Sequence, residues 1–245
     1  MRYQFDVQAA KKAICRFNRA PSFVATDCVL DKFFPIKGRP THASEIAVYV
    51  VLIDGLWATQ LYRDKGAADK IAKALVDNWP SLAREPRRLK PDDLERRPQQ
   101  VYQAAKPLLD VVFNRTRTRT KHYSFATKFL HWMTRVHFPP VDRNARIAIN
   151  WFQGQQACPR ALRINKCQPH ADGYVAEYEK WIIFYYDLLN SIDRTDRKIL
   201  LDVDRSSQPD QVRVGNSILR VLDKVFFILG KDINNRELTV NRRKK

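Results

Sequence analysis

The chain has 245 residues and a large excess of positive charge, since 44 Lys and Arg against 26 Asp and Glu give a formal net charge of +18 and a pI near 10.0. Such an excess attracts polyanions by counterion release, so we expect a nucleic-acid partner. Double-stranded DNA is the first candidate. No apolar run reaches the roughly 18 residues of a membrane span, and the first residues lack the apolar core of a signal peptide. We therefore expect a cytoplasmic protein without a membrane partner. A monomer is also expected.

Composition predicts an all-α fold. Apolar residues make up 44% of the chain, only seven glycines occur, and the apolar residues recur mostly at helical spacing. We predict one two-lobed helical domain over residues 1–235 and a basic tail over residues 236–245. The four cysteines include no CxxC pair, and Cys158, Cys167 and His170 match no common zinc or iron–sulfur spacing. We expect reduced thiols, no metal and no cofactor.

The first third of the chain alternates helical patterns with a proline-containing segment. A helix is expected over residues 4–18, whereas residues 21–40 break the apolar periodicity with prolines and a glycine and are expected to form a loop. A helix capped by Thr41 or Ser44 then runs to about residue 61, and a shorter one covers residues 67–78.

Gln60 follows Trp57 at the end of the first of these apolar helices. It is either a polar surface residue between packed helices or a side chain that enters the space left when a base swings out of the duplex. An amide suits the second role because it offers donors and acceptors to the orphaned partner base.

Residues 80–100 are charged and rich in proline, and we expect them to form a connection because their prolines prevent one long helix. A helix follows over residues 99–113, with a kink at Pro107. Next comes a run of basic residues interleaved with threonines, in which the basic members are Arg115, Arg117, Arg119 and Lys121. This run either grips successive phosphates of DNA or forms a solvated loop.

The segment from residue 121 to 150 carries the chemistry that the sequence suggests. A helix over residues 123–136, with Ser124 as its expected cap, places Lys128 near an apolar face formed by Phe125, Phe129, Trp132 and Met133. Burial there lowers the pKa of a lysine and makes the neutral, nucleophilic amine accessible. The alternative is an ammonium that reaches solvent or binds a phosphate.

Asp142 follows an extended bridge, HFPPV, because residues before proline avoid the helical conformation. It occupies an N-cap position, where a carboxylate accepts backbone N–H bonds and stays ionised. Arg143 and Arg146, just beyond, are expected to bind DNA. Cleavage of an N-glycosidic bond builds positive charge on the sugar, so an ionised Asp142 would stabilise the transition state while Lys128 attacks the anomeric carbon.

These residues resemble the helix-hairpin-helix DNA glycosylase superfamily. Lys128 followed by Pro140-Val141-Asp142 and Arg146 reproduces the order in which that superfamily carries a lysine, a Pro-Val-Asp sequence and a following helix. The stretch WATQLYRDKGAADKIAKAL is similar to the early Ala-x-Gln helix turn and implies a wedge role for Gln60. The blocks YSFATKFLHW, PPVDRNARIAIN and SILRVLDKVFFILGK also resemble an uncharacterised bacterial family with a YSFASK-like motif, which implies a bacterial cytosolic protein.

Two features depart from the superfamily pattern. HYSFATK stands where a Gly-x-Gly phosphate-binding turn is expected, so the phosphate anchor is assigned to Arg115 through Lys121. The interval between Lys128 and Asp142 is also shorter than usual by roughly one helical turn. The iron–sulfur cluster of some relatives has no ligands in this chain.

The last third is expected to contain a polar loop over residues 153–170, a helix over 171–191, a charged linker over 194–211 and a last helix over 217–230. Three aromatic residues are candidates to stack on an extruded base, namely Trp132, Trp181 and Tyr185. Asp223 and Lys224 of the last helix are interpreted as structural.

The function expected from these features is a DNA glycosylase that flips a damaged or modified base into a pocket, in DNA repair or in defence against phage DNA, with or without strand cleavage by lyase chemistry. The main alternative is a non-catalytic DNA-binding protein. A nuclease and an RNA-binding protein are two further alternatives, although no cluster of carboxylates or histidines suggests a metal-dependent nuclease.

Overall fold

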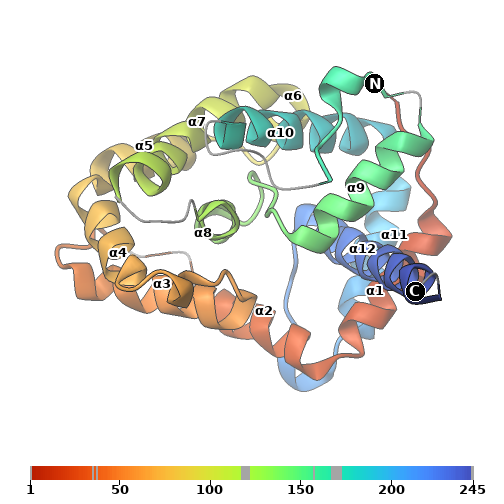
Figure 1. Ribbon diagram of the computed structural model, residues 1–245, viewed down its shortest axis with the longest axis horizontal. Coiled ribbons are helices and arrows are strands. Elements are labelled where there is room, and N and C mark those ends of the chain that lie inside the picture. The colour runs from red at the N-terminus through yellow and green to blue at the C-terminus, as the bar shows by residue number, and fades with distance from the viewer. Residues whose placement is uncertain are drawn as a thin grey trace.

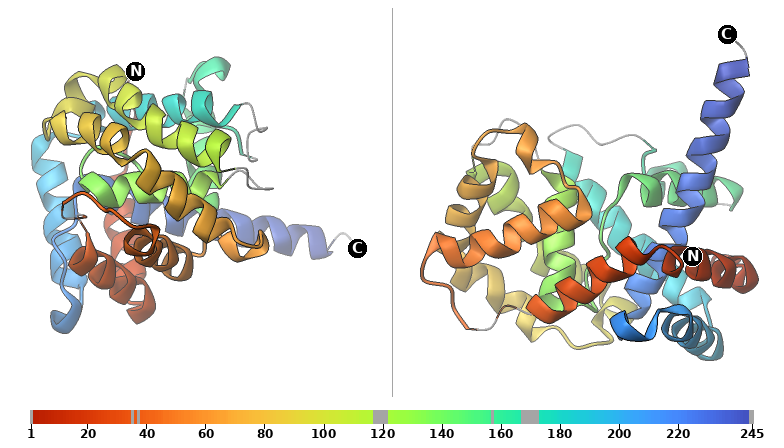
Figure 2. Two further views of the ribbon diagram at one scale, coloured as in Figure 1. Left: turned by 90° about the vertical axis from the view of Figure 1, so that its left-hand side faces the viewer. Right: turned by 90° about the horizontal axis from the view of Figure 1, so that it is seen from below.

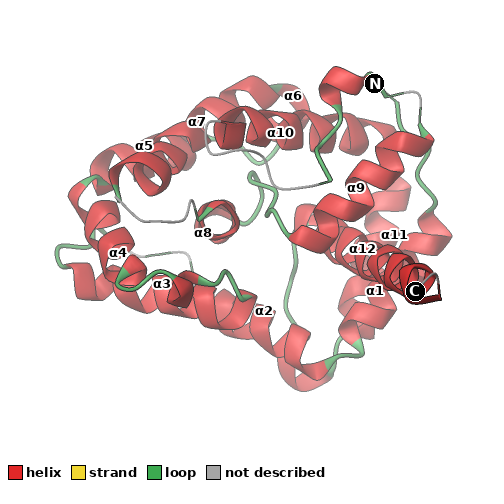
Figure 3. Cartoon of the chain, in the orientation of Figure 1, coloured by secondary structure: helices red, strands yellow, loops and turns green. Residues whose placement is uncertain are grey.

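The computed structural model describes residues 2–34, 36, 38–116, 122–156, 158–166 and 173–243, with side chains described up to residue 236. No strand occurs among these residues, which confirms the all-α prediction (Figure 3). The α-helices are α1 (Val7–Asn18), α2 (Pro21–Phe33), α3 (Ala43–Trp57), α4 (Ala67–Asp77), α5 (Trp79–Arg88), α6 (Asp93–Arg96), α7 (Pro98–Asp110), α8 (Tyr123–Thr134), α9 (Arg143–Gln155), α10 (Tyr174–Ser191), α11 (Arg194–Ser207) and α12 (Ile218–Arg243).

Helix α8 lies at the centre of one group of helices, surrounded in Figure 1 by α3, α4, α5, α7 and α10. Nine of its twelve residues are buried, including an unbroken run from Phe125 to Trp132. A helix that is buried on all sides has no solvent face for a charge, so any ionisable side chain on it must find partners inside the protein. Lys128 is such a side chain.

A second group consists of α1, α9, α11 and α12. Helix α12 packs most extensively on α9 and also on α1, which in turn packs on α11. The C-terminal part of α12 projects from the body of the protein (Figure 2). Helix α2 contacts both α1 and α3 and so connects the two groups, and one continuous apolar core runs through both.

Three predictions of irregular structure are wrong. Residues 21–33 form α2, because a proline at the first position of a helix lacks only an N–H that would be unpaired there. Residues 194–207 form α11, capped by Asp193, whose Oδ1 accepts from the backbone N–H of Asp196 at 2.7 Å. Residues 79–88 and 93–96 form α5 and α6 within the expected connection.

Two helix ends also differ from the prediction. Ser124 does not cap α8, since its hydroxyl donates instead to the carbonyl oxygen of Val141 at 3.0 Å. Helix α12 continues to Arg243, so the described part of the predicted C-terminal tail is helical.

Candidate functional site

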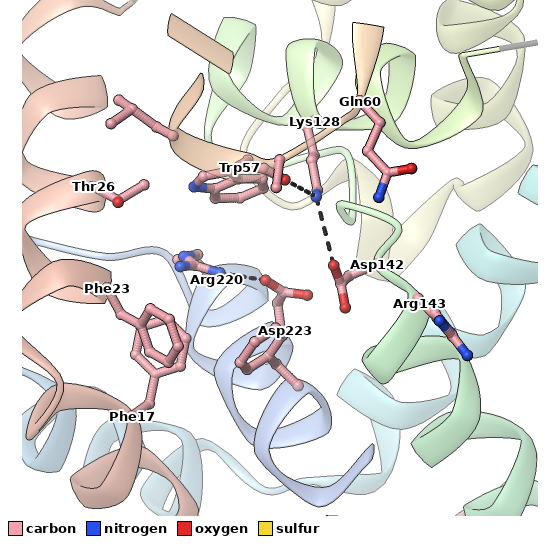
Figure 4. Close-up of a pocket in the computed structure, with 13 residues that line it drawn as sticks. Phe17, Phe23, Thr26, Trp57, Gln60, Lys128, Asp142, Arg143, Arg220 and Asp223 are labelled. Atoms are coloured by element: carbon pink, nitrogen blue, oxygen red, sulfur yellow. Dashed lines mark hydrogen bonds and ion pairs between the residues drawn. The ribbon is translucent and has the colours of Figure 1, made fainter. Parts of the chain in front are cut away.

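Lys128 and Asp142 meet at the boundary between the two groups of helices. The Nζ atom of Lys128 lies 3.6 Å from Oδ2 of Asp142 and donates a 3.0 Å hydrogen bond to the carbonyl oxygen of Trp57 (Figure 4). Trp57 is the last residue of α3, so this carbonyl belongs to the negative end of the helix dipole. The ammonium is thus held between a carboxylate and a helix C-terminus.

The extended bridge that precedes α9 fixes Asp142 opposite Lys128. The backbone N–H of Val141 donates to Oγ1 of Thr127 at 3.1 Å, and the Val141 carbonyl accepts from Ser124, so both bonds tie the bridge to α8. Oδ1 of Asp142 accepts from the backbone N–H of Asn144 at 2.7 Å, which makes Asp142 the N-cap of α9 as expected. Its Oδ2 remains free to face Lys128.

Burial sets the chemistry of Lys128. Only 4% of the residue is exposed, and loss of solvation lowers its pKa, although the nearby carboxylates of Asp142 and Asp223 partly offset this effect. A lowered pKa increases the fraction of neutral amine, which is the form that acts as a nucleophile.

A cavity of about 300 Å³ opens beside this pair. Its lining joins both groups of helices and comprises Phe17, Phe23, Thr26, Leu56, Trp57, Ala58, Gln60, Lys128, Asp142, Arg143, Arg220, Asp223 and Phe227. The rings of Phe17 and Phe23 lie 4.8 Å apart, and Phe227 meets both edge-on. The walls therefore combine flat aromatic rings with a few charged groups, as expected of a pocket for a planar polar ligand.

Arg220 forms the charged floor of this cavity. Its guanidinium binds Asp27 at 2.7 Å and Asp223 on its own helix, and it lies 4.6 Å from the ring of Trp57 and 5.0 Å from that of Phe17. Burial raises the pKa of Asp223 to about 6, although Arg220 opposes the shift. This carboxyl therefore changes protonation state at about pH 6.

Gln60 lies on a loop that takes an unusual backbone conformation. Ala58 and Gln60 both adopt the left-handed region, with φ of 47° and 65°. Asp54 holds the loop, because its Oδ1 accepts from the backbone N–H of Leu61 at 2.8 Å and from the hydroxyl of Thr59 at 2.7 Å. Non-glycine residues in this region are strained, and such strain is concentrated at functional sites.

The structure brings together four of the predicted site residues, since Gln60, Lys128, Asp142 and Arg143 all line the cavity. Arg115 is exposed but lies apart from it, bound to Asp110 at 3.1 Å and to Asn78 at 2.7 Å. The predicted phosphate-binding residues Arg117, Arg119 and Lys121 lie outside the described residues.

Four predicted roles do not fit the structure. Trp132, Trp181 and Tyr185 do not line the cavity, because each is at most 1% exposed and its ring is packed in the core. Arg146 is only 2% exposed and forms a buried 2.6 Å ion pair with Glu177, so it cannot reach DNA as predicted. Helical periodicity shows on which face of its helix a residue lies, but it does not show which other element packs on that face.

Several cavity residues were missed by the sequence analysis. Phe23 and Thr26 lie in the segment expected to be a loop, and Asp223 was assigned a structural role. One signal was present, since Arg220, Asp223 and Phe227 recur at three- and four-residue steps and so share one face of a helix.

Comparisons of the chain with protein-family models, curated proteins and solved structures returned no match. Among the described residues, no three or more His, Cys, Asp and Glu side chains are grouped so as to hold a metal ion. Cys167 and His170 lie outside the described part of the chain. The same part of the chain contains no helix with the length and apolarity needed to cross a bilayer.

Proposed function

We propose that the protein is a DNA glycosylase that draws a modified or damaged base into the cavity and cleaves its N-glycosidic bond. The observation that carries the proposal is the 3.6 Å contact between a buried lysine and an N-capping carboxylate at the wall of an aromatic-lined cavity. The net charge of +18 supports a DNA partner, because it favours a polyanion.

In this reaction the bond between C1′ and the base nitrogen breaks, the electron pair leaves with the base, and positive charge develops on the sugar. Asp142 would stabilise that charge, because its hydrogen bond from the backbone N–H of Asn144 at the N-terminus of α9 fixes the carboxylate in place. A carboxylate oriented before the reaction requires no reorganisation during it.

Lys128 would supply the nucleophile if the protein also cleaves the strand. The neutral amine attacks C1′, and loss of a proton to Asp142 leaves a covalent aminal that opens to a Schiff base. If instead water attacks, Asp142 accepts the proton of the water and an intact abasic site remains. The lowered pKa of Lys128 favours the first route, because it increases the amount of free amine.

Gln60 and Arg143 would hold the DNA at the cavity mouth. Both are exposed, and both line the cavity from opposite groups of helices. A guanidinium at this position suits a phosphate of the extruded nucleotide, and the Gln60 amide suits the unpaired partner base. The aromatic rings of Phe23 and Trp57 would stack on the base itself.

The proposal is tested by incubating the purified protein, in chelator, with genomic DNAs that carry different modified bases and with DNA that carries alkylated or oxidised bases. Abasic sites are then scored with an aldehyde-reactive probe. The proposal expects abasic sites on at least one DNA and their loss in Asp142→Asn, while DNA affinity is retained. Tight binding without abasic sites on any DNA would instead support the non-catalytic alternative.

Lyase chemistry is tested separately by borohydride reduction during turnover. Trapping of a covalent protein–DNA adduct by the wild type but not by Lys128→Met would assign the amine as nucleophile. Abasic sites without an adduct would assign attack to water.

A further inference from the structure

The two carboxylate oxygens of Asp223 differ in their bonding. One oxygen, Oδ2, binds Arg220, but the other, Oδ1, is buried and has no hydrogen-bond partner among the described residues. The residue is 3% exposed and lines the cavity, where Figure 4 draws it between Arg220 and Asp142. A buried polar atom without a partner is costly, so its retention at a cavity wall points to a ligand that completes its bonding.

The charges around the cavity favour a proton on Asp223. Among the described residues, four buried or partly buried carboxylates, those of Asp27, Asp142, Asp204 and Asp223, are paired with only three cations, Lys128, Arg220 and Lys224. Asp142 has two partners, the backbone N–H of Asn144 and the Lys128 ammonium, and Asp27 binds the cations of both Arg220 and Lys224. Asp223 has a single partner in the described part of the chain, Arg220, so a proton on this group disturbs the fewest interactions.

We infer that Asp223 is the general acid that protonates the departing base, a role that rests on the proposed glycosylase function. Its carboxyl O–H would donate to an acceptor atom of the base as the glycosidic bond breaks. The bond electrons pass to the base nitrogen, the proton of Asp223 neutralises the leaving base, and Asp223 becomes a carboxylate. Release of the base then allows a proton from solvent to restore the acid.

The pKa of Asp223, raised to about 6 by burial and by Asp142, supports this assignment. Bound DNA would raise this pKa further, because its phosphates add negative charge and its base excludes water from the cavity. The charged and titratable groups that act on Asp223 from the surrounding helices are Asp142 before α9, Lys128 on α8, Tyr185 on α10 and Arg220 on α12, while Asp27 on α2 binds the same guanidinium.

This role restricts the substrate to neutral bases that carry an acceptor atom. A neutral base is a poor leaving group, so protonation accelerates its departure. A base that already bears a positive charge, such as a purine alkylated at N3 or N7, needs no proton and gains nothing from the acid. Asp142, by contrast, would act on every substrate, because the sugar becomes positive whichever base leaves.

The experiment measures single-turnover base release from about pH 5 to about pH 9, on the DNA that the abasic-site assay identifies, for the wild type, Asp223→Asn and Asp223→Glu. The wild-type rate should fall as the pH rises. The apparent pKa of this fall should be close to, or higher than, the pKa of Asp223 in the free protein. Asp223→Asn should lose this falling limb and be slower at low pH by about 10²-fold or more, the usual contribution of a general acid. Asp223→Glu, which keeps a carboxyl but places it differently, should retain a falling limb with a shifted apparent pKa.

Two results would overturn the inference. One is an Asp223→Asn variant with the wild-type profile and a rate within a few-fold of wild type. The other is a wild-type rate that rises with pH along a limb lost in Asp223→Asn, because Asp223 would then act as a base. If Asp223→Asn does not fold, Asp223→Glu decides, since an unmoved pH limb in that variant would assign the limb to another group.

Failure of the inference is distinguishable from failure of the proposed function. If the wild type releases no base from any DNA, the glycosylase proposal itself fails. If it releases a base and Asp223→Asn behaves as the wild type does, only the role of Asp223 fails. Binding of each variant to DNA with a stable abasic-site analogue serves as the control for folding.

Discussion

Gly230 of α12 lies directly against the backbone of Asn144 in the first turn of α9. A β-carbon at Gly230 would lie 1.8 Å from the Asn144 carbonyl oxygen, far inside contact distance. Asn144 is also the residue whose N–H is capped by Asp142, so this close approach fixes the position of Asp142 relative to Asp223 on α12. The spacing of the two carboxyls depends on a glycine outside the cavity.

Gly230→Ala is therefore expected to separate α9 from α12 and to destabilise the protein by about 2 kcal/mol or more, because the clash involves rigid backbone. Urea unfolding measures this loss. Gly154→Ala in the same α9 is the matched control, since no atom beyond the neighbouring backbone of α9 itself lies within 4 Å of the added carbon. Alanine is the better helix former, so the control should be neutral or slightly stabilising. Equal stability of the two variants would contradict the packing described.

Arg143 and Arg146 are one turn apart on α9 but should behave in opposite ways. Arg143 is exposed at the cavity mouth, whereas Arg146 is buried against Glu177. Arg146→Met should lower the free energy of unfolding by about 3 to 5 kcal/mol, because it leaves an uncompensated buried carboxylate. Arg143→Met should change it by less than about 0.5 kcal/mol.

The same two variants, Arg143→Met and Arg146→Met, should also differ in their affinity for DNA. Arg143→Met is expected to weaken binding and to reduce the slope of log affinity against log salt by about 1, as loss of one phosphate contact would. At a pH and temperature where Arg146→Met is folded, its salt slope should equal that of the wild type. A reduced slope in Arg146→Met would show that the buried ion pair opens on DNA.

Buried His131 should make the protein sensitive to acid. Desolvation lowers its pKa from 6.5 to about 4, and its Nδ1–H donates to the carbonyl oxygen of Phe138 at 2.9 Å. The unfolded chain therefore binds more protons between about pH 6.5 and pH 4, so stability present at higher pH is lost as the pH falls through this window, by up to about 3 kcal/mol.

His131→Asn retains a side-chain N–H donor but does not titrate. Urea unfolding at several pH values should show that the stability difference between the wild type and this variant shrinks from pH 7 toward about pH 4. A difference that stays constant over this range would exclude His131 as a source of the acid sensitivity.

Gln60 should affect the rate of base release only from DNA that has a partner strand. If its amide fills the gap opposite an extruded base, Gln60→Ala should slow base release from duplex DNA by about tenfold, since a few hydrogen bonds are lost. Release from a single strand of the same sequence should be unchanged, because that strand has no orphaned base. An equal loss on both DNAs would place Gln60 in base binding instead.

The sequence predicted the helical class and four of the cavity residues, and for Asp142 and Lys128 the reasons are local. Asp142 follows a Pro-Pro-Val bridge that specifies an N-cap, and Lys128 falls on a helix with apolar residues on every side. Both features depend on neighbours within one helix or one turn, so periodicity and capping rules recognise them.

The rest of the site depends on contacts between segments that are distant in the sequence. Arg220 meets Asp27, 193 residues away, and the side chain of Lys128 meets a carbonyl 71 residues before it. No local pattern predicts which helices meet, so the buried Arg220 and Asp223 were not expected to line the cavity. Trp132, Trp181 and Tyr185 were assigned to it because they are large and aromatic, although large aromatic residues lie mostly in the core.

The central claim is that Asp142 and Lys128 form the reactive pair of a DNA glycosylase. The most direct test is to incubate the protein with modified DNAs in chelator and to identify the low-molecular-weight products by mass spectrometry. We predict a free base that accumulates with the wild type in step with abasic sites and is lost with Asp142→Asn, a variant expected to bind DNA as the wild type does. Release of nucleotides instead of a free base, or an undiminished yield of free base from Asp142→Asn, would contradict this claim.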